Sequence, residues 1–323
     1  MKPIAVDAMG GDKAPGEIVA GARQAADELD VPVLLVGDPS VFEPGRLEVV
    51  AASEVIGMDE DPAVGVRRKK DSSLLRAAEA VRDGRASAMV SAGNTGATMG
   101  SALLRMGRLS GVSRPAIATP IPVPGSTPTV LLDAGANADC QPAWLVQFAL
   151  MGSVFATERY GIAEPRVGLL SIGEEPTKGN ALVKETHALL AAGVPGVRFV
   201  GNVEGRDVMT DAADVVVCDG FTGNVTLKAL EGSLTFMRDA VFGAMTSTDE
   251  AVKASEVLIP LLLPLATELD PDTYGGALLL GVDGVCIISH GSSSAKAIVN
   301  AVGVARDMVE QDLVGALREA VRR

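Results

Sequence analysis

Six short segments of the sequence are rich in Gly, Asn, Asp and Ser, which are residue types that can build a binding turn. They read DAMGGD at 7–12, SAGNTGA at 91–97, LDAGANAD at 132–139, SIGEEPTKGN at 171–180, CDGFTGN at 218–224 and SHGSSS at 289–294. Glycine lets backbone N–H groups approach a ligand closely, and a following helix directs its positive N-terminus toward the same point. One such segment would indicate only a tight turn, but six of them together predict a site for an anion.

The polar side chains of these segments are expected to meet, because each segment follows a predicted strand. In an open parallel sheet the carboxyl ends of the strands line a common crevice, which is where ligands bind. We therefore expect all six segments at one edge of the sheet. The polar residues that would share the cleft are Asp7, Asn94, Asp133, Asn137, Asn180, Asp219, Asn224 and His290.

The elements that must position these segments are short Val, Ile and Leu runs that alternate with stretches of helical periodicity. Strands are predicted at 3–6, 33–36, 47–51, 88–91, 129–132, 167–171, 215–218 and 285–289, and a long last helix at about 294–322. This alternation is typical of an α/β fold with three αβα layers and a largely parallel sheet. No Pro- or Ser-rich linker divides the chain, so we expect a single domain over 1–323.

Composition and charge exclude several classes of protein. The chain has 323 residues, 47% of them hydrophobic, so a disordered chain or a disulfide-stapled miniprotein is excluded. A net charge of −13 at pH 7 argues against a nucleic-acid binder, which needs a basic face. Three widely spaced cysteines and two histidines form no disulfide framework and no zinc-site pattern. We expect no metal ion and a reducing, cytoplasmic environment.

Common nucleotide and hydrolase motifs are missing from the sequence. It has no G-x-x-x-x-G-K-[ST], and no G-x-G-x-x-G followed by a ribose-binding acid. The segment at 291–295 comes near to G-x-S-x-G, but no histidine follows it in the chain. A nucleotide cofactor and a serine triad are therefore not indicated, and we expect no cofactor.

Taken together, these segments closely resemble the PlsX family, the phosphate acyltransferases of bacterial phospholipid synthesis. Beyond SAGNTGA and LDAGANADC, the motifs are VDAMGGDKAP at 6–15, RRKKDSS at 67–73, IGEEPTKGN at 172–180, GNVEGRD at 201–207, DGFTGNVTLKALEG at 219–232, YGGA at 274–277 and SHGSS at 289–293. The resemblance covers essentially the whole chain. It implies that inorganic phosphate attacks the thioester of a long-chain acyl-(acyl carrier protein), which gives acyl phosphate and free carrier.

The same resemblance implies an architecture as well as a reaction. It predicts a homodimer with a fold like that of the isocitrate and isopropylmalate dehydrogenases and the phosphotransacetylases. It also predicts a protruding helical segment at about 230–273 within the single phosphate acyltransferase domain.

A site for this reaction must hold phosphate beside a thioester carbonyl and stabilise the oxyanion that forms. Lys178 could pair with phosphate, Asn224 could donate to the carbonyl oxygen, and His290 could protonate the leaving thiolate. Asn224 could instead only cap a helix, and His290 could be a structural hydrogen-bonding residue. These three are the predicted catalytic residues. The predicted substrate-binding residues, with the two aspartates as orienting groups, are Asp7, Gly10, Gly11, Gly93, Asn94, Thr95, Gly96, Asn137, Asn180, Asp219, Gly220 and Gly223.

The densest basic cluster of this acidic chain is Arg67, Arg68, Lys69 and Lys70. It could be a solvated turn before a helix that is capped by Ser72 or Ser73. An acidic enzyme needs a basic patch to bind an acidic acyl carrier protein, so we expect carrier docking at this cluster.

A leucine-rich segment at 253–270 could contact a membrane or a second subunit. Pro260 and Pro264 predict two short helical pieces joined at a kink. The ten apolar residues at 257–266 are too few to span a bilayer. We expect either a dimer interface or peripheral contact with the inner face of the plasma membrane. The leucines that share one helical face are Leu258, Leu261, Leu262, Leu265 and Leu269.

Three other functions remain open from the sequence. One is a phosphotransacetylase that uses acyl-CoA, and another is an NAD-dependent hydroxy-acid dehydrogenase, which the missing dinucleotide motif disfavours. The third is a membrane-associated scaffold for lipid synthesis without catalytic activity.

Overall fold

The computed structural model describes residues 1–322, with Pro271 described by its backbone alone. Within that range eleven strands form one sheet in the spatial order β3-β2-β1-β4-β11-β10-β5-β6-β9-β7-β8. The strands are β1 Ile4–Asp7, β2 Val33–Gly37, β3 Glu48–Ala51, β4 Ala88–Ser91, β5 Ala116–Ile121, β6 Thr129–Leu132, β7 Arg166–Ser171, β8 Arg198–Glu204, β9 Val215–Val217, β10 Ala277–Leu280 and β11 Val285–Ile288. The helices are α1 Gly16–Glu28, α2 Pro62–Arg68, α3 Ser73–Arg82, α4 Thr95–Arg105, α5 Pro142–Tyr160, α6 Ala181–Ala191, α7 Gly220–Met245, α8 Asp249–Glu268, α9 Ala295–Glu310 and α10 Leu313–Arg322.

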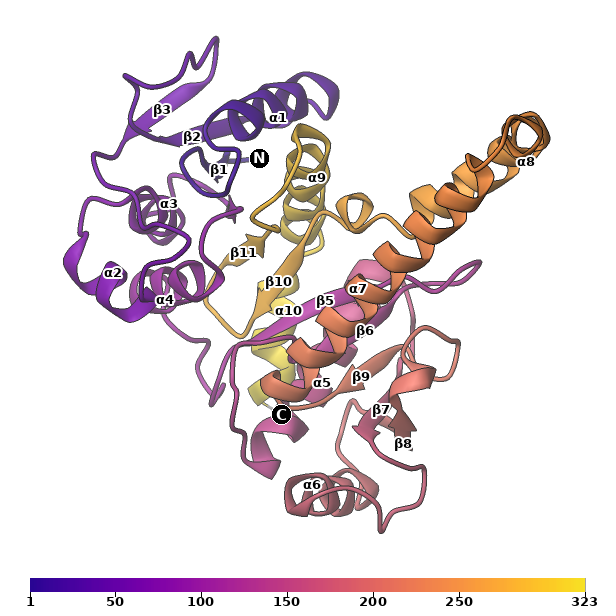
Figure 1. The fold of residues 1–323 in the computed structure, drawn as a ribbon. Coiled ribbons are helices and arrows are strands. Elements are labelled where there is room, and N and C mark those ends of the chain that lie inside the picture. Colours follow the sequence, from indigo (N-terminus) through magenta and orange to yellow (C-terminus); the bar gives the residue numbers. More distant parts are fainter. Residues whose placement is uncertain (323) are drawn as a thin grey trace.

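Helices cover both faces of the sheet, so the predicted three-layer αβα fold is confirmed (Figure 1). Successive side chains of a strand point to opposite faces, and the core follows this rule. In β4, Ala88 and Val90 join the core that also contains residues of α1, α5 and α9. Met89, between them, joins the core on the other face, with residues of α3 and α4. β4 is therefore buried on both sides, as its continuous apolar sequence requires, whereas the edge strands β3 and β8 keep exposed positions.

The eight predicted strands are all present, and those at 88–91 and 129–132 match residue for residue. Three further strands, β5, β8 and β10, were not predicted. β5 contains Pro120, and proline disfavours a strand in the interior of a sheet. β8 has several half-exposed positions, so its sequence lacks a continuous apolar run. β10 begins directly after Gly275 and Gly276, which read as a turn.

The directions of the strands correct one prediction about the site. β10 runs antiparallel to both of its neighbours, β11 and β5, and β5 runs antiparallel to β6. The remaining pairs in each half of the sheet are parallel. The half with β1, β4 and β11 therefore runs opposite to the half with β6, β7 and β9. The six Gly-rich segments do not lie at one edge, because three of them follow strands that point the other way.

The register nevertheless brings the two sets of strand ends to one level. Leu132, the last residue of β6, pairs with Ala118 of β5, which pairs with Leu278 of β10. Leu278 pairs in turn with Ile287, one residue before the end of β11. The carboxyl ends of the two halves thus meet near the middle of the sheet, separated only by β10 and β5.

The predicted last helix is two helices rather than one. α9 ends at Glu310, and α10 begins at Leu313. Asp312, between them, has a left-handed φ of 51°, which turns the chain. Its side chain accepts a hydrogen bond of 3.2 Å from the backbone N–H of Gly315, so it caps α10.

Helices α7 and α8 contact each other and project from the body of the molecule as a pair (Figure 1). Pro260 and Pro264 lie inside α8, so the prediction of two separate helical pieces is wrong. Each proline leaves one carbonyl without its helical donor. Those carbonyls belong to Glu256 and Pro260, which are exposed, so water can bind them. Among the described residues, no helix is long and apolar enough to cross a membrane.

Candidate active site

The segments after β1 and β4 form one compact cluster around the buried carboxylate of Asp7. Ser91 donates its hydroxyl to Asp7 Oδ2 over 2.7 Å and accepts the backbone N–H of Gly93 over 2.9 Å. A Cβ added to Gly10 would lie 2.7 Å from the nitrogen of Gly93, so only glycine allows the two turns to touch. Burial raises the pKa of Asp7, and its hydrogen bonds partly offset this. Asp7 therefore holds the turns in place rather than facing a ligand.

The segments after β6 and β9 form a second cluster around Asp133. This buried carboxylate accepts backbone N–H groups from Ile117, Gly135, Ala136 and Asn137 over 2.8 to 3.1 Å. Burial raises its pKa, and these bonds act in the opposite direction. The start of α7 packs on the same segment, since a Cβ added to Gly223 would lie 1.9 Å from the carbonyl oxygen of Asp133.

A cavity of about 200 Å³ lies between the two clusters and is lined from both halves of the sheet. Thr95 at the start of α4 and His290 after β11 come from the first half, and Ala134 and Asn224 come from the second. The central strands β5 and β10 supply its floor. The strand ends that meet at this level of the sheet therefore do share one space, although they run in opposite directions.

The polar end of this cavity holds three groups that can do chemistry: Asn224, Lys228 and His290. Lys228 Nζ lies 3.5 Å from His290 Nε2 and 2.7 Å from Glu231 Oε2. His290 Nδ1 lies 2.8 Å from Ser292 Oγ and accepts the backbone N–H of Ser292 over 3.3 Å, so these contacts orient the ring with Nε2 toward Lys228. Asn224 donates one amide hydrogen to the carbonyl of Ala134 over 3.2 Å, and an amide carries a second donor for a ligand.

Two hydroxyl groups of residues that line the cavity have no hydrogen-bond partner within the described chain. They belong to Ser289 and Thr119, and both oxygen atoms are buried. Buried hydroxyls are nearly always paired in folded proteins. Their oxygen atoms are shielded from solvent, so they lie behind the surface of the cavity as it stands.

Several predicted site residues lie outside the cavity. Lys178 is exposed on the segment after β7 and is not among the residues that line the cavity. Asn94 and Asn180 are N-caps that accept backbone N–H groups over 3.0 Å, at the starts of α4 and α6. Asn137 donates to the carbonyl of Pro115 and to Asp133, each over 2.8 Å. The polar groups of these three asparagines are thus engaged within the fold.

The alternative role of Asn224 as a helix cap is wrong. The N-cap of α7 is Asp219, which accepts the backbone N–H of Thr222 over 2.9 Å. Asn224 lies in the second turn of the helix, and Lys228 lies one turn further on the same face. The prediction missed Lys228, although its spacing of four residues from Asn224 is a signal that could have identified it.

The basic cluster is not uniform. Arg67, Arg68 and Lys70 are exposed at the end of α2, whereas Lys69 is half-buried. The ammonium group of Lys69 donates to Glu60 Oε2 over 2.7 Å and to the carbonyl of Val55 over 2.5 Å. Lys69 therefore fixes the loop before α2, and its ammonium group is engaged within the protein.

Helix α3 begins after the basic cluster, and Ser72 is its N-cap residue. The side chain of Ser72 makes no capping hydrogen bond, and its hydroxyl is buried without a partner in the described chain. Ser72 thus occupies the predicted cap position without capping through its side chain.

The cysteines do not supply a nucleophile. Burial raises the pKa of the Cys140 and Cys286 thiols to about 12, and burial also raises that of Cys218. All three are protonated at neutral pH, and the thiolate is the reactive form. Within residues 1–322, no group of three or more His, Cys, Asp or Glu side chains is placed to hold a metal ion.

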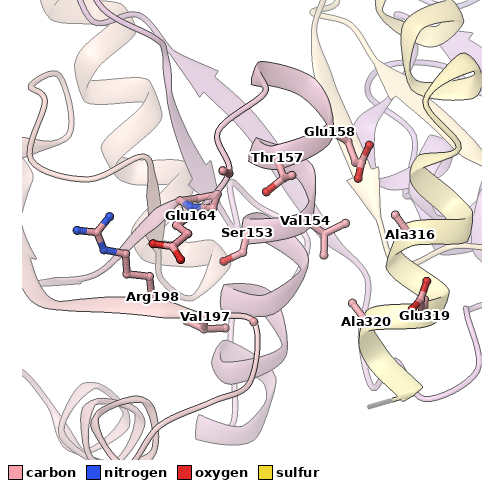
Figure 2. Close-up of a pocket in the computed structure, with 13 residues that line it drawn as sticks. Ser153, Val154, Thr157, Glu158, Glu164, Val197, Arg198, Ala316, Glu319 and Ala320 are labelled. Atoms are coloured by element: carbon pink, nitrogen blue, oxygen red, sulfur yellow. The ribbon is translucent and has the colours of Figure 1, made fainter.

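A larger cavity of about 610 Å³ lies elsewhere, between α5 and α10 (Figure 2). It is lined by Glu158, Glu164 and Glu319 with Arg198 as its basic residue, and it includes none of the Gly-rich segments. The smaller cavity is also lined by two carboxylates, Glu231 and Asp272, so charge alone does not separate the two cavities. The smaller cavity is the better candidate for an anion site because residues of four Gly-rich segments line it.

Comparison with known proteins points to one family. The family model described as Fatty acid synthesis protein matches residues 2–315. The phosphate acyltransferase of Heliobacterium modesticaldum is 50% identical over 329 residues, which cover 98% of this chain and 97% of that protein. That of Nostoc sp. is 47% identical over 324 residues, with 98% and 95% covered.

Solved structures with the same fold are more distant in sequence. A phosphotransacetylase from Streptococcus pyogenes has a TM-score of 0.63 at 17% identity, covering 96% of this chain and 94% of its own. A 4-hydroxythreonine-4-phosphate dehydrogenase from Klebsiella pneumoniae has a TM-score of 0.55 at 13% identity, covering 96% and 100%. These likenesses show the fold alone, and they confirm the predicted relation to the phosphotransacetylase and dehydrogenase folds.

Proposed function

This chain belongs to the PlsX family of phosphate acyltransferases, and from that premise we propose how its residues transfer an acyl group from acyl-(acyl carrier protein) to inorganic phosphate. A phosphate oxygen attacks the thioester carbonyl carbon and forms a tetrahedral oxyanion. The carbon–sulfur bond then breaks, which leaves acyl phosphate and the carrier thiolate, and the thiolate takes up a proton. The products feed lipid biosynthesis.

The observation that supports this site most strongly is the cavity with Asn224, Lys228 and His290 at its polar end. The Lys228 ammonium group binds the phosphate and reduces its repulsion with the developing oxyanion. The second amide hydrogen of Asn224 stabilises that oxyanion.

His290 is the proposed proton donor to the leaving thiolate. Its Nε2 atom lies 3.5 Å from Lys228 Nζ, beside the place where phosphate would bind, so a proton on this nitrogen would be within reach of the leaving sulfur. Phosphate is already a nucleophile at neutral pH, so the site needs no strong base. Its main task is to orient a phosphate oxygen toward the face of the thioester carbonyl.

Lys178 and the Gly-rich turns remain proposed substrate contacts. Lys178 could approach bound phosphate only if the segment 172–180 moves toward the cavity, because the side chain does not line it here. The backbone N–H groups of Gly10, Gly93 and Gly220 are bonded within the fold, to Asp7, Ser91 and Asn137. Gly11 and Gly96 are therefore the proposed backbone donors to the substrate.

The proposed docking surface for the acidic carrier consists of Arg67, Arg68 and Lys70. These three cations are exposed, while the fourth is engaged inside the protein. Their helix, α2, packs against α4, whose first residue, Thr95, lines the cavity. A carrier bound at α2 would thus lie next to α4, whose N-terminal residue lines the cavity.

The helical pair α7 and α8 is the proposed contact with a second subunit or a membrane. Leu261 is 73% exposed and Leu258 is 50% exposed. Exposing a patch of leucine side chains to water is unfavourable, so such a patch marks a contact surface. We favour a homodimer that buries part of this face, and we propose a cytoplasmic enzyme with peripheral contact through 253–270. Because α8 carries Asp249, Glu250 and Glu256, such contact would depend on apolar burial more than on anionic lipid.

The function is tested directly by incubating the purified protein with phosphate and an acyl-(acyl carrier protein). We expect acyl phosphate and free carrier thiol in equal amounts, because each turnover breaks one thioester. Acyl phosphate formed only from acyl-CoA would instead indicate a phosphotransacetylase. If neither thioester reacts, the protein is a scaffold rather than an enzyme.

Replacing Lys228 with alanine should lower kcat at least ~100-fold, the scale of losing one preorganised electrostatic contact. Asn224→Ala should have a similar effect, with thermal unfolding unchanged for both variants. Lys253→Ala, which removes an exposed cation of α8, is the matched control and should retain activity. The motif-based prediction is that Lys178→Ala also loses at least ~100-fold. A loss with Lys178→Ala but not with Lys228→Ala would move the phosphate site out of the cavity.

Charge reversal at Arg67, Arg68 and Lys70 should raise the KM for the carrier thioester at least ~10-fold and flatten its salt dependence, because rim charges steer association. Any turnover of acyl-CoA should change much less. Lys184→Glu, at an exposed lysine of α6, serves as the control. An equal rise of KM for both thioesters would show that these residues do not act through the carrier.

The double variant Leu261→Glu, Leu262→Glu separates the two roles of the helical pair. Liposome flotation and the oligomeric state are measured for wild type, for this variant and for the control Leu189→Glu on α6. A membrane role predicts lost flotation with an intact dimer, since burying a carboxylate among lipid chains is unfavourable. A dimer interface predicts a monomer. A wild-type protein that never floats would remove the membrane contact from the proposal.

A further inference from the structure

The apolar part of the cavity follows one face of α7 away from the polar end. Leu227, Leu230 and Leu234 line it, and they alternate along the helix with Lys228 and Glu231, which line it as well. Leu234 lies ten positions after Asn224, which is about 15 Å along a helix axis at its usual rise. The cavity is therefore long, with a continuous row of leucines along one side.

The wall that faces α7 is also apolar. Ile117 and Ile121 of β5 are 4% and 3% exposed, and both line the cavity. Leu269, directly after α8, lines it as well. The loop after β5 is tied to the end of α8, because the backbone N–H of Gly125 donates to Glu268 Oε1 over 2.8 Å. This contact holds the far end of the cavity against the helical pair.

The apolar stripe does not end where the cavity ends. On α7 it continues past Leu234 to Met237 and Val241, with alternating steps of three and four residues, so all of them lie on one helical face. Met237 is 60% exposed and Val241 is 41% exposed. On α8 a matching series runs from Leu269 back through Leu265, Leu262 and Leu258, and the two helices contact each other. An apolar path thus leads from the reaction centre onto the projecting helical pair.

We propose that this path is the site of the acyl chain, with the thioester carbonyl at Asn224 and Lys228 and the alkyl tail directed toward α8. Leu234 of α7 and Leu269 mark the point where the chain leaves the enclosed cavity. These two residues are therefore the specificity-determining positions for chain length. The identity of the ligand rests on the proposed function, since the polar end is where the acyl carbonyl would react.

An unbranched chain fits this shape better than a compact apolar ligand. The cavity of about 200 Å³ extends over three turns of α7, so its cross-section is narrow. Each methylene group buried along it adds favourable transfer free energy in proportion to the apolar area removed from water. Longer chains should therefore bind more tightly, until they pass Leu234 and reach the exposed stripe.

The test compares two alkylphosphonates, which carry a phosphonate head like that of acyl phosphate and cannot transfer an acyl group. Binding of dodecylphosphonate and butylphosphonate is measured by calorimetry, below the concentration at which either forms micelles. In Leu234→Trp the indole should obstruct the exit of the cavity, so dodecylphosphonate should bind at least ~10-fold more weakly. Butylphosphonate, which is too short to reach Leu234, should change less than about twofold.

Two further variants guard against a trivial result. Phe236→Trp places the same indole on α7 at a side chain that is 73% exposed and does not line the cavity, so it should leave both affinities unchanged. Leu269→Trp obstructs the same exit from the opposite wall and should repeat the effect of Leu234→Trp. Circular dichroism and thermal unfolding confirm that each variant is folded.

The outcomes distinguish this inference from the proposed function. Equal weakening of both phosphonates in Leu234→Trp and Leu269→Trp, or no weakening, overturns the chain site, as does a wild-type protein that binds neither probe. The same variants are then assayed with dodecanoyl and butanoyl carrier thioesters. In one outcome, wild type turns over neither thioester while the Leu234→Trp and Leu269→Trp variants still bind dodecylphosphonate more weakly than wild type does, with butylphosphonate binding unchanged. In that case the chain site stands and the proposed function fails.

Discussion

The site depends on the way two oppositely directed halves of one sheet are joined. β10 and β5 lie between them, and each pairs antiparallel with both of its neighbours. The register of these pairs brings the end of β6 level with the end of β11. Turns that leave the two halves in opposite directions therefore face each other across two strands. Without this reversal, Asn224 and His290 would not line the same cavity.

Two buried carboxylates stabilise the turns on either side of this junction. Asp7 orders the turns of the first half through Ser91, and Asp133 orders those of the second half through backbone N–H groups. Both lie in an environment that raises the carboxyl pKa, and both are surrounded by donors that favour the charged form. Asp7 and Asp133 are thus explained as parts of the scaffold. At the polar end of the cavity, Lys228 is paired with Glu231 over 2.7 Å, so a bound anion would share this lysine with a carboxylate.

Much of this could be predicted from the sequence, because strand composition and Gly-rich turns are local signals. The eight predicted strands are present, and the turns with Asp7 and Asp219 follow them. Strand direction could not be predicted, because it depends on β5 and β10, which are short and interrupted by Pro120 or preceded by glycines. The ion pair of Lys69 with Glu60 could not be predicted from the sequence either, because it depends on how the loop before α2 folds back on that helix. The position of Lys228, on the same face of α7 as Asn224, follows from helix geometry once the start of α7 is known.

The measurement that tests this account most directly is a crystal structure of the protein with dodecylphosphonate. The account predicts the phosphonate within hydrogen-bond distance of Lys228 Nζ and the Asn224 amide, with the alkyl chain running along Leu227 and Leu230 toward Leu234. A phosphonate bound instead beside Lys178 on the segment after β7, with the cavity between α7 and β5 unfilled, would contradict it.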